Sequence, residues 1–68
     1  MNIDIRTHIK NNFKDSNTEE IKNSIEASIK EQDEITLPGL GVLFEILWQN
    51  SNNHEEILNN IANGLKRN

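Results

Sequence analysis

The sequence contains no cysteine or tyrosine, and only one proline and one tryptophan in 68 residues. Without cysteine there is no disulfide bond and no thiolate ligand for zinc, which argues against a stapled secreted mini-protein and favours a reducing compartment. Only 34% of the residues are hydrophobic. We expect residues 1–68 to form one small domain with a thin core, because so short a chain buries only about 60% of its unfolded surface.

Positive charge is also scarce. Seven Lys and Arg residues stand against eleven Asp and Glu, and no basic run is longer than two residues. Nucleic-acid binding needs clustered Lys and Arg that neutralise phosphates, so the composition argues against a nucleic-acid partner. The longest apolar-rich stretch, Ile35–Trp48, is shorter than the roughly 20 residues that cross a bilayer, and no signal peptide is recognisable. We therefore expect a cytoplasmic protein with no membrane partner.

Three segments carry apolar side chains at the spacing of an amphipathic helix. These side chains are Ile5, Ile9 and Phe13, then Ile21, Ile25 and Ile29, and finally Ile57, Leu58, Ile61, Ala62 and Leu65. We predict the first helix within residues 2–14, with Asn2 or Asp4 as its N-cap. The last helix is predicted to close at Gly64, because glycine is favoured where helices end.

A capping box predicts where the second helix begins. In this motif a polar side chain caps the helix and a glutamate three residues later returns a hydrogen bond. Two pairs have the required spacing, Ser16 with Glu19 and Asn17 with Glu20. Either pair places a carboxylate in the first turn, where the helix dipole favours negative charge.

The most apolar part of the sequence, residues 37–49, admits two interpretations. In the first, Pro38 occupies the first turn of a helix that is apolar nearly all round. This interpretation gives a mainly α fold, a small bundle of three to four short helices, and it is the one we favour.

In the second interpretation, Pro38 and Gly39 form a type II turn that joins a strand at residues 34–37 to a strand at residues 42–48. Two glycines weaken a helix by roughly 1 kcal/mol each, and Pro38 biases Leu37 away from helical backbone angles. This second interpretation gives an α+β fold. Because an isolated hairpin is only marginally stable, it would need strong helix packing or a dimer.

Candidate catalytic and ligand-binding residues are few. His8 and His54 are the only histidines, and neither has the sequence partners of a metal site or a general base, so both are predicted on the surface. We predict no enzyme active site and no metal or other cofactor, since no nucleophile or phosphate-binding motif occurs. Glu45 is the one charge in the apolar run, either a buried acid with a raised pKa or, as we favour, part of a solvated edge with Gln49.

The central segment holds more apolar side chains than a small monomer covers. We therefore predict that it serves both as core and as an association surface, whose partner is a second copy or another protein. The residues assigned to it are Leu37, Pro38, Gly39, Leu40, Gly41, Val42, Leu43, Phe44, Ile46, Leu47 and Trp48.

The central block Leu37–Glu45, LPGLGVLFE, resembles the minor small acid-soluble spore proteins of type I from endospore-forming bacteria, and the likeness extends from Met1–Arg6 to Gly64–Lys66. The resemblance implies a non-enzymatic protein of the forespore and spore core, without an established molecular role. The chain does not resemble the abundant α/β-type members that coat spore DNA. Acid solubility agrees with its charges, because protonation of the eleven carboxylates leaves about ten positive charges that repel one another.

Three functions remain as alternatives. The first is a spore-core protein that acts by association with itself or with another spore protein. The second follows a fainter resemblance, over Asp33–Gly41, to HU-type nucleoid-associated DNA-binding proteins, in which two helices precede a hairpin; the basic arms of that family are missing. The third is an amino-acid store that is degraded on germination.

Overall fold

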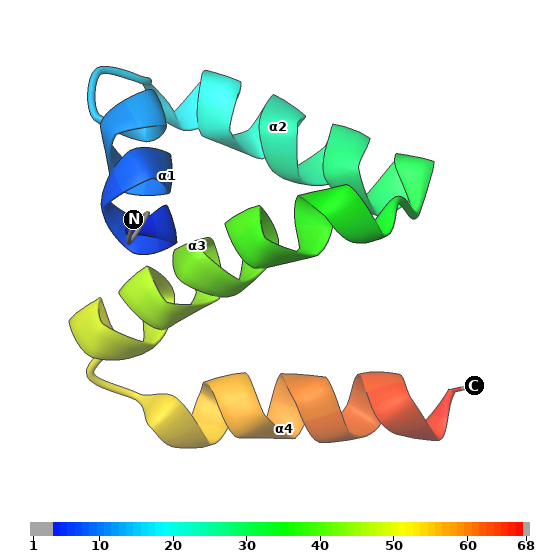
Figure 1. The fold of residues 1–68 in the computed structure, drawn as a ribbon. Helices are drawn as coiled ribbons and strands as arrows, with labels where there is room; N and C mark the ends of the chain where they lie inside the picture. The colour runs from blue at the N-terminus through cyan, green and yellow to red at the C-terminus, as the bar shows by residue number, and fades with distance from the viewer. Residues whose placement is uncertain (1–3, 68) are drawn as a thin grey trace.

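The computed structural model describes residues 4–67, and within them it contains four α-helices and one short 3₁₀ turn. The elements are α1 (Ile5–Phe13), α2 (Thr18–Glu31), η1 (Glu34–Thr36), α3 (Leu37–Asn50) and α4 (His54–Lys66). No strand occurs in this range, which confirms the mainly α fold. Figure 1 shows α3 crossing the molecule, with α1 and α2 on one side of it and α4 on the other.

Asp4 caps the start of α1. Its carboxylate accepts hydrogen bonds from the backbone N–H of Thr7 at 3.2 Å and from the Thr7 hydroxyl at 2.6 Å. These bonds stabilise the charged form and hold the pKa of Asp4 below its usual value. The other candidate cap, Asn2, lies outside the described residues.

Asn17, and not Ser16, forms the capping box of α2. The Asn17 side chain accepts the backbone N–H of Glu20 at 2.8 Å, and the Glu20 carboxylate accepts the backbone N–H of Asn17 at 3.0 Å. Two of the otherwise unpaired N–H groups at this helix start are satisfied in this way. The helix ends at Glu31, because the next residue, Gln32, adopts a left-handed φ of 52°.

The hairpin interpretation of the central segment is wrong. The first predicted strand, residues 34–37, is a 3₁₀ turn that runs into α3, and the second, residues 42–48, lies inside α3. Neither Gly39 nor Gly41 has a positive φ, so the turn that their presence suggested is not formed. The hairpin that underlay the HU-type resemblance is therefore absent from the described residues.

Leu37 adopts helical angles, φ −60° and ψ −43°, although it precedes Pro38. The predicted bias against this conformation is overcome by the 3₁₀ turn before it. Within that turn the backbone N–H of Thr36 donates to the carbonyl of Asp33 at 3.0 Å, and the N–H of Leu37 donates to the carbonyl of Glu34. The chain thus enters α3 already coiled, with Pro38 in the first turn, where its missing N–H leaves no bond unmade.

The prediction that Gly64 closes the last helix is also wrong. Gly64 lies inside α4, which continues to Lys66, and its carbonyl accepts the backbone N–H of Arg67 at 3.3 Å. A basic residue in the last turn favours this extension, because the positive charge lies at the negative end of the helix dipole.

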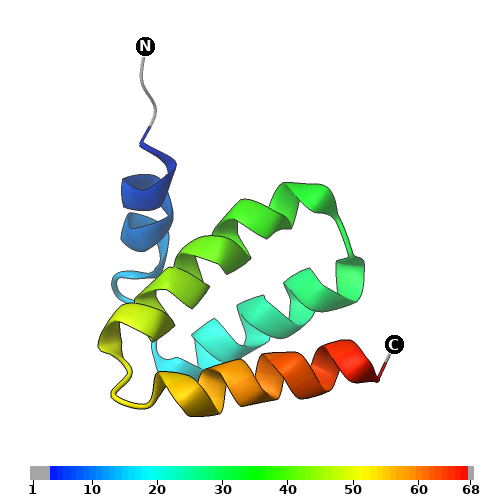
Figure 2. The same cartoon turned by 90° about the horizontal axis from the view of Figure 1, so that it is seen from below.

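The core lies between α1, α2 and α3. Val42, which is 6% exposed, is the one buried side chain among residues 4–67. Packing there is loose: α1, α2 and α3 together line an open, largely apolar cavity of about 450 Å³, to which Phe13, Ile25 and Leu43 contribute. In Figures 1 and 2, α4 diverges from α3 beyond the loop that joins them, so it adds little to this core.

We predict that Asn17→Ala lowers the free energy of unfolding by about 1 kcal/mol, because it removes the side-chain half of the capping box. The measurement is urea unfolding followed by far-ultraviolet circular dichroism. Ser16→Ala is the matched control and is expected to leave the unfolding midpoint unchanged. An equal loss in both variants would show that the cap is not specific to Asn17.

Candidate interaction surface

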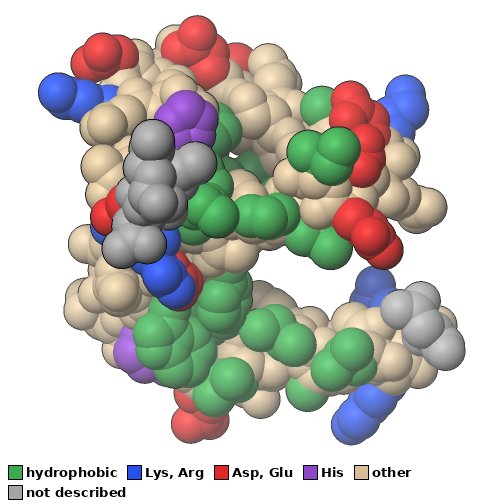
Figure 3. Space-filling view, in the orientation of Figure 1, with side chains coloured by type: hydrophobic (Ala, Val, Ile, Leu, Met, Phe, Trp, Pro, Cys, Tyr) green, Lys and Arg blue, Asp and Glu red, His purple; other side chains and the backbone are tan. Residues whose placement is uncertain are grey.

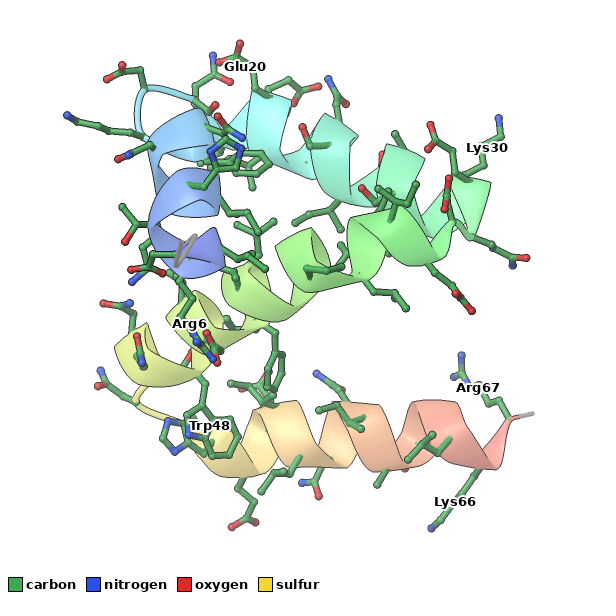
Figure 4. The ribbon with its side chains drawn as sticks, viewed as in Figure 1. Arg6, Glu20, Lys30, Trp48, Lys66 and Arg67 are labelled. Carbon is green, nitrogen blue, oxygen red and sulfur yellow. The ribbon has the colours of Figure 1, made fainter. Side chains whose placement is uncertain are left out.

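A bidentate ion pair joins α1 to α3. Arg6 donates from Nε to Glu45 Oε1 at 2.7 Å and from Nη2 to Glu45 Oε2 at 2.8 Å, across 39 residues of sequence. The Arg6 side chain is 65% exposed and that of Glu45 is 41% exposed, so the pair lies at the rim of the α1–α3 contact. Figure 4 shows Arg6 reaching from α1 toward α3.

The same pair sets the ionisation of both groups. Hydrogen bonding to Arg6 lowers the pKa of Glu45, and hydrogen bonding to Glu45 raises the pKa of Arg6. The alternative that Glu45 is a buried acid with a raised pKa is therefore wrong, because its side chain is partly exposed and its pKa is lowered. The partly exposed edge that we favoured is present, but its arginine partner was not predicted, because Arg6 lies 39 residues away in the sequence.

The corner between α3 and α4 is held by an aromatic stack. The rings of Trp48 and His54 are 4.0 Å apart between centroids and 13° from parallel. His54 Nε2 lies 2.7 Å from the Trp48 carbonyl oxygen, which can only accept, so this nitrogen is the donor. His54 is exposed, as predicted, but its role in fixing the direction of α4 was not foreseen. The sequence does place an aromatic residue and a histidine on either side of the short polar segment between the two helices, and this spacing could have suggested the stack.

The eleven residues of the predicted association segment divide between two sides of α3. Eight of them share cavities with side chains of α1 or α2: Pro38, Gly39, Leu40, Gly41, Val42, Leu43, Ile46 and Leu47. The other three are Leu37, Phe44 and Trp48, whose spacings of seven and four residues place them on one line along α3. We call these three residues the outer stripe, of which Leu37 is 58% exposed and Phe44 is 41% exposed.

A second apolar surface faces the outer stripe from α4. Leu58, near the start of α4, lines a hollow of about 480 Å³ together with Phe44 and Trp48. The hydrophobic side chains along α4 are all well exposed: Leu58 is 51% exposed, Ile61 43% and Leu65 71%. Figure 3 shows hydrophobic surface on both sides of the opening between α4 and the remainder of the molecule. The outer stripe and this face of α4 together form the candidate surface, which we call the apolar cleft.

The described residues provide no other obvious site. Among residues 4–67, no three His, Asp or Glu side chains are grouped so that they could hold a metal ion. Within the same range, no helix combines the length and apolarity that crossing a bilayer requires. The apolar cleft can bury hydrophobic surface against another molecule, and that is its evident capability.

Comparison with known proteins covers nearly the whole chain. The sequence model of the family described as "Small, acid-soluble spore protein I" matches residues 3–65. A protein of that description from Halalkalibacterium halodurans is 38% identical over 97% of this chain and 100% of its own. Those from Bacillus velezensis and Bacillus subtilis are each 37% identical over 97% of this chain and 96% of theirs. No solved structure matches the chain significantly.

We predict that Glu45→Gln flattens the loss of stability in acid. The folded-state pKa of Glu45 lies below its ordinary value of 4.5, so the contribution of the pair is complete above that value and is lost as the pH falls through the lowered pKa. Urea unfolding midpoints measured between about pH 6 and pH 2 provide the test. The variant is expected to be less stable than wild type at pH 6 and to differ from it least at pH 2.

Glu26→Gln is the control for this experiment, because Glu26 has no ion pair among the described residues. It should follow the wild-type pH profile. Parallel profiles for wild type and Glu45→Gln would show that the ion pair contributes nothing in solution.

We predict that His54→Ala shifts the fluorescence emission of Trp48 to longer wavelength and lowers the free energy of unfolding by about 1 kcal/mol. The stack covers one face of the indole ring, and aromatic pairs contribute about 0.5–1.5 kcal/mol beyond their burial. His8→Ala, which removes the other histidine, should change neither quantity. Unchanged emission from His54→Ala would contradict the stacked corner.

Proposed function

The chain belongs to the small, acid-soluble spore protein I family, and on that premise we propose that it is a non-enzymatic protein of the spore core that acts by protein association through the apolar cleft. The family description concerns spores, and the sequence of this chain resembles the family over all its helices. The observation that supports association is the pair of unpartnered apolar faces on α3 and α4.

The outer stripe is the part of the cleft best suited to a protein partner. Phe44 and Trp48 lie with ring centroids 6.1 Å apart, so they present a continuous aromatic surface. Large aromatic and aliphatic side chains that are exposed together are the usual centre of a protein interface. The basic side chains needed for a phosphate backbone are not gathered beside the cleft: Arg6 pairs with Glu45, and Lys66 and Arg67 lie at the far end of α4 (Figure 4).

We predict that Leu37→Gln weakens association by about tenfold or more. Burial of a leucine side chain is worth about 1.5–3 kcal/mol, and the substitution removes that gain from the outer stripe. The measurement is the size of the particle that contains the chain in a native extract of spores, by size-exclusion chromatography with detection of the tagged chain. The wild-type chain is expected to elute above its own mass of 7.8 kDa, and the variant closer to that mass.

Ile29→Gln is the matched control, because Ile29 is 59% exposed, as Leu37 is 58%, but lies on α2 outside the cleft. It should leave the particle size unchanged. Elution of the wild-type chain as a monomer from spore extracts would reject association as its mode of action.

A further inference from the structure

We propose that the partner of the apolar cleft is a second copy of the chain, paired through α4 in antiparallel orientation across a two-fold axis near Ile61. The proposal rests on the proposed function, since it names the partner of the same surface. It draws on four features of the described residues: exposed area, the apolar register of α4, the charges on its edge, and the geometry of the α3–α4 corner.

The exposed area of the chain matches what a dimer would bury. A compact monomer of 7.8 kDa exposes about 4,400 Å², whereas this chain exposes 6119 Å². The excess is about 1,700 Å². Permanent homodimers bury about 1,000–2,500 Å² on each subunit, so one interface of this class would bring the chain to the exposure of an ordinary folded protein.

The apolar residues of α4 are self-complementary. If two antiparallel copies of α4 meet at Ile61, residues that share an edge of the helix and lie on opposite sides of Ile61 come together. Ile57 and Gly64, seven residues apart, share one edge, and Leu58 and Leu65 share the other. Ile57 then lies beside Gly64 of the second copy, and Leu58 lies beside its Leu65. No atom comes within 4 Å of the position that a Cβ on Gly64 would occupy, so within one chain nothing requires glycine there. In the paired arrangement, the missing side chain leaves room for Ile57 of the second copy.

The charges on α4 fit the same register. Glu55 and Lys66 are three turns apart, so they lie along the same edge of the helix, about 16 Å from each other. Within one chain they are too distant to form an ion pair. Two-fold pairing at Ile61 brings Glu55 of each copy beside Lys66 of the other, and a two-fold interface forms every such contact twice.

The corner between α3 and α4 explains why α4 does not simply close the cleft itself. The Trp48–His54 stack fixes the first turn of α4 against the end of α3. The Ser51 hydroxyl donates to the Leu47 carbonyl at 2.6 Å, and the Ser51 backbone N–H donates to the Trp48 carbonyl at 3.5 Å. The Ser51 bonds fix the end of α3, and the Trp48–His54 stack holds α4 at an angle to it, so Ile61 and Leu65 are left open to a second α4.

A charge exchange on the purified full-length chain tests the proposal. Sedimentation equilibrium at neutral pH and low salt should give twice the chain mass for wild type. Glu55→Lys and Lys66→Glu, made singly, should each raise the dimer dissociation constant by about tenfold, because each turns two attractive contacts into repulsive ones. The double variant should recover dimerisation to within a few-fold of wild type.

This rescue separates pairing between copies from effects within one helix. Both substitutions oppose the helix dipole, so without pairing the double variant would be weaker than either single one. Glu19→Lys is the control, since Glu19 is the second residue of α2 as Glu55 is of α4, and it should leave the dimer unchanged. Circular dichroism should show that each variant keeps the helical content of the wild type.

Two outcomes would overturn the proposal: a wild-type chain that sediments as a monomer at about 1 mM, or additive weakening in the double variant. A monomeric purified chain that still elutes in a larger particle from spore extracts would identify a different protein as the partner. In that case the proposed function would stand and the second copy would be rejected. Monomers in both measurements would reject the two together.

Discussion

The structure depends on one constraint: a helix with apolar side chains nearly all round it lies in a chain too small to cover every side of it. α3 contacts α1 and α2 through one side, where Val42 is buried, and presents Leu37, Phe44 and Trp48 on the other. Hydrophobic burial is the main favourable term in folding, and here it is divided between an internal core and an external surface. The apolar cleft is the part of this hydrophobic surface that the chain does not bury within itself.

Two polar arrangements hold the helices around α3 in place. The Arg6–Glu45 pair anchors α1 at one edge, and the Trp48–His54 stack directs α4 at the end. Both lie at the surface, where an ion pair contributes little to stability and an aromatic pair contributes about 0.5–1.5 kcal/mol. Their effect is on direction: they set the angles at which α1 and α4 leave α3, and hence the shape of the cleft.

Local patterns in the sequence predicted most of the helices. The features that were not predicted depend mainly on contacts between segments that are distant in the sequence. The apolar spacing of α1, α2 and α4 involves residues within a turn or two of one another, so it could be predicted from short windows. The same windows narrowed each of the first two caps to two candidates, from which the structure selects Asp4 and Asn17. The 3₁₀ turn before Pro38 was missed because the general bias before proline pointed the other way. The Arg6–Glu45 pair spans 39 residues and becomes visible only once α1 lies on α3.

Carboxylates perform several of the structural tasks in this small protein. Asp4 and Glu20 hold the starts of two helices, Asp33 accepts the Ile35 N–H at the start of the 3₁₀ turn, and Glu45 joins α1 to α3. Protonation weakens each of these contacts, because a neutral carboxyl accepts hydrogen bonds less strongly and cannot form an ion pair. The conditions that keep such a chain dissolved in strong acid therefore also loosen its native arrangement. Solubility in acid and the stability of the folded state are therefore separate properties here, because the same protonation favours the first and weakens the second.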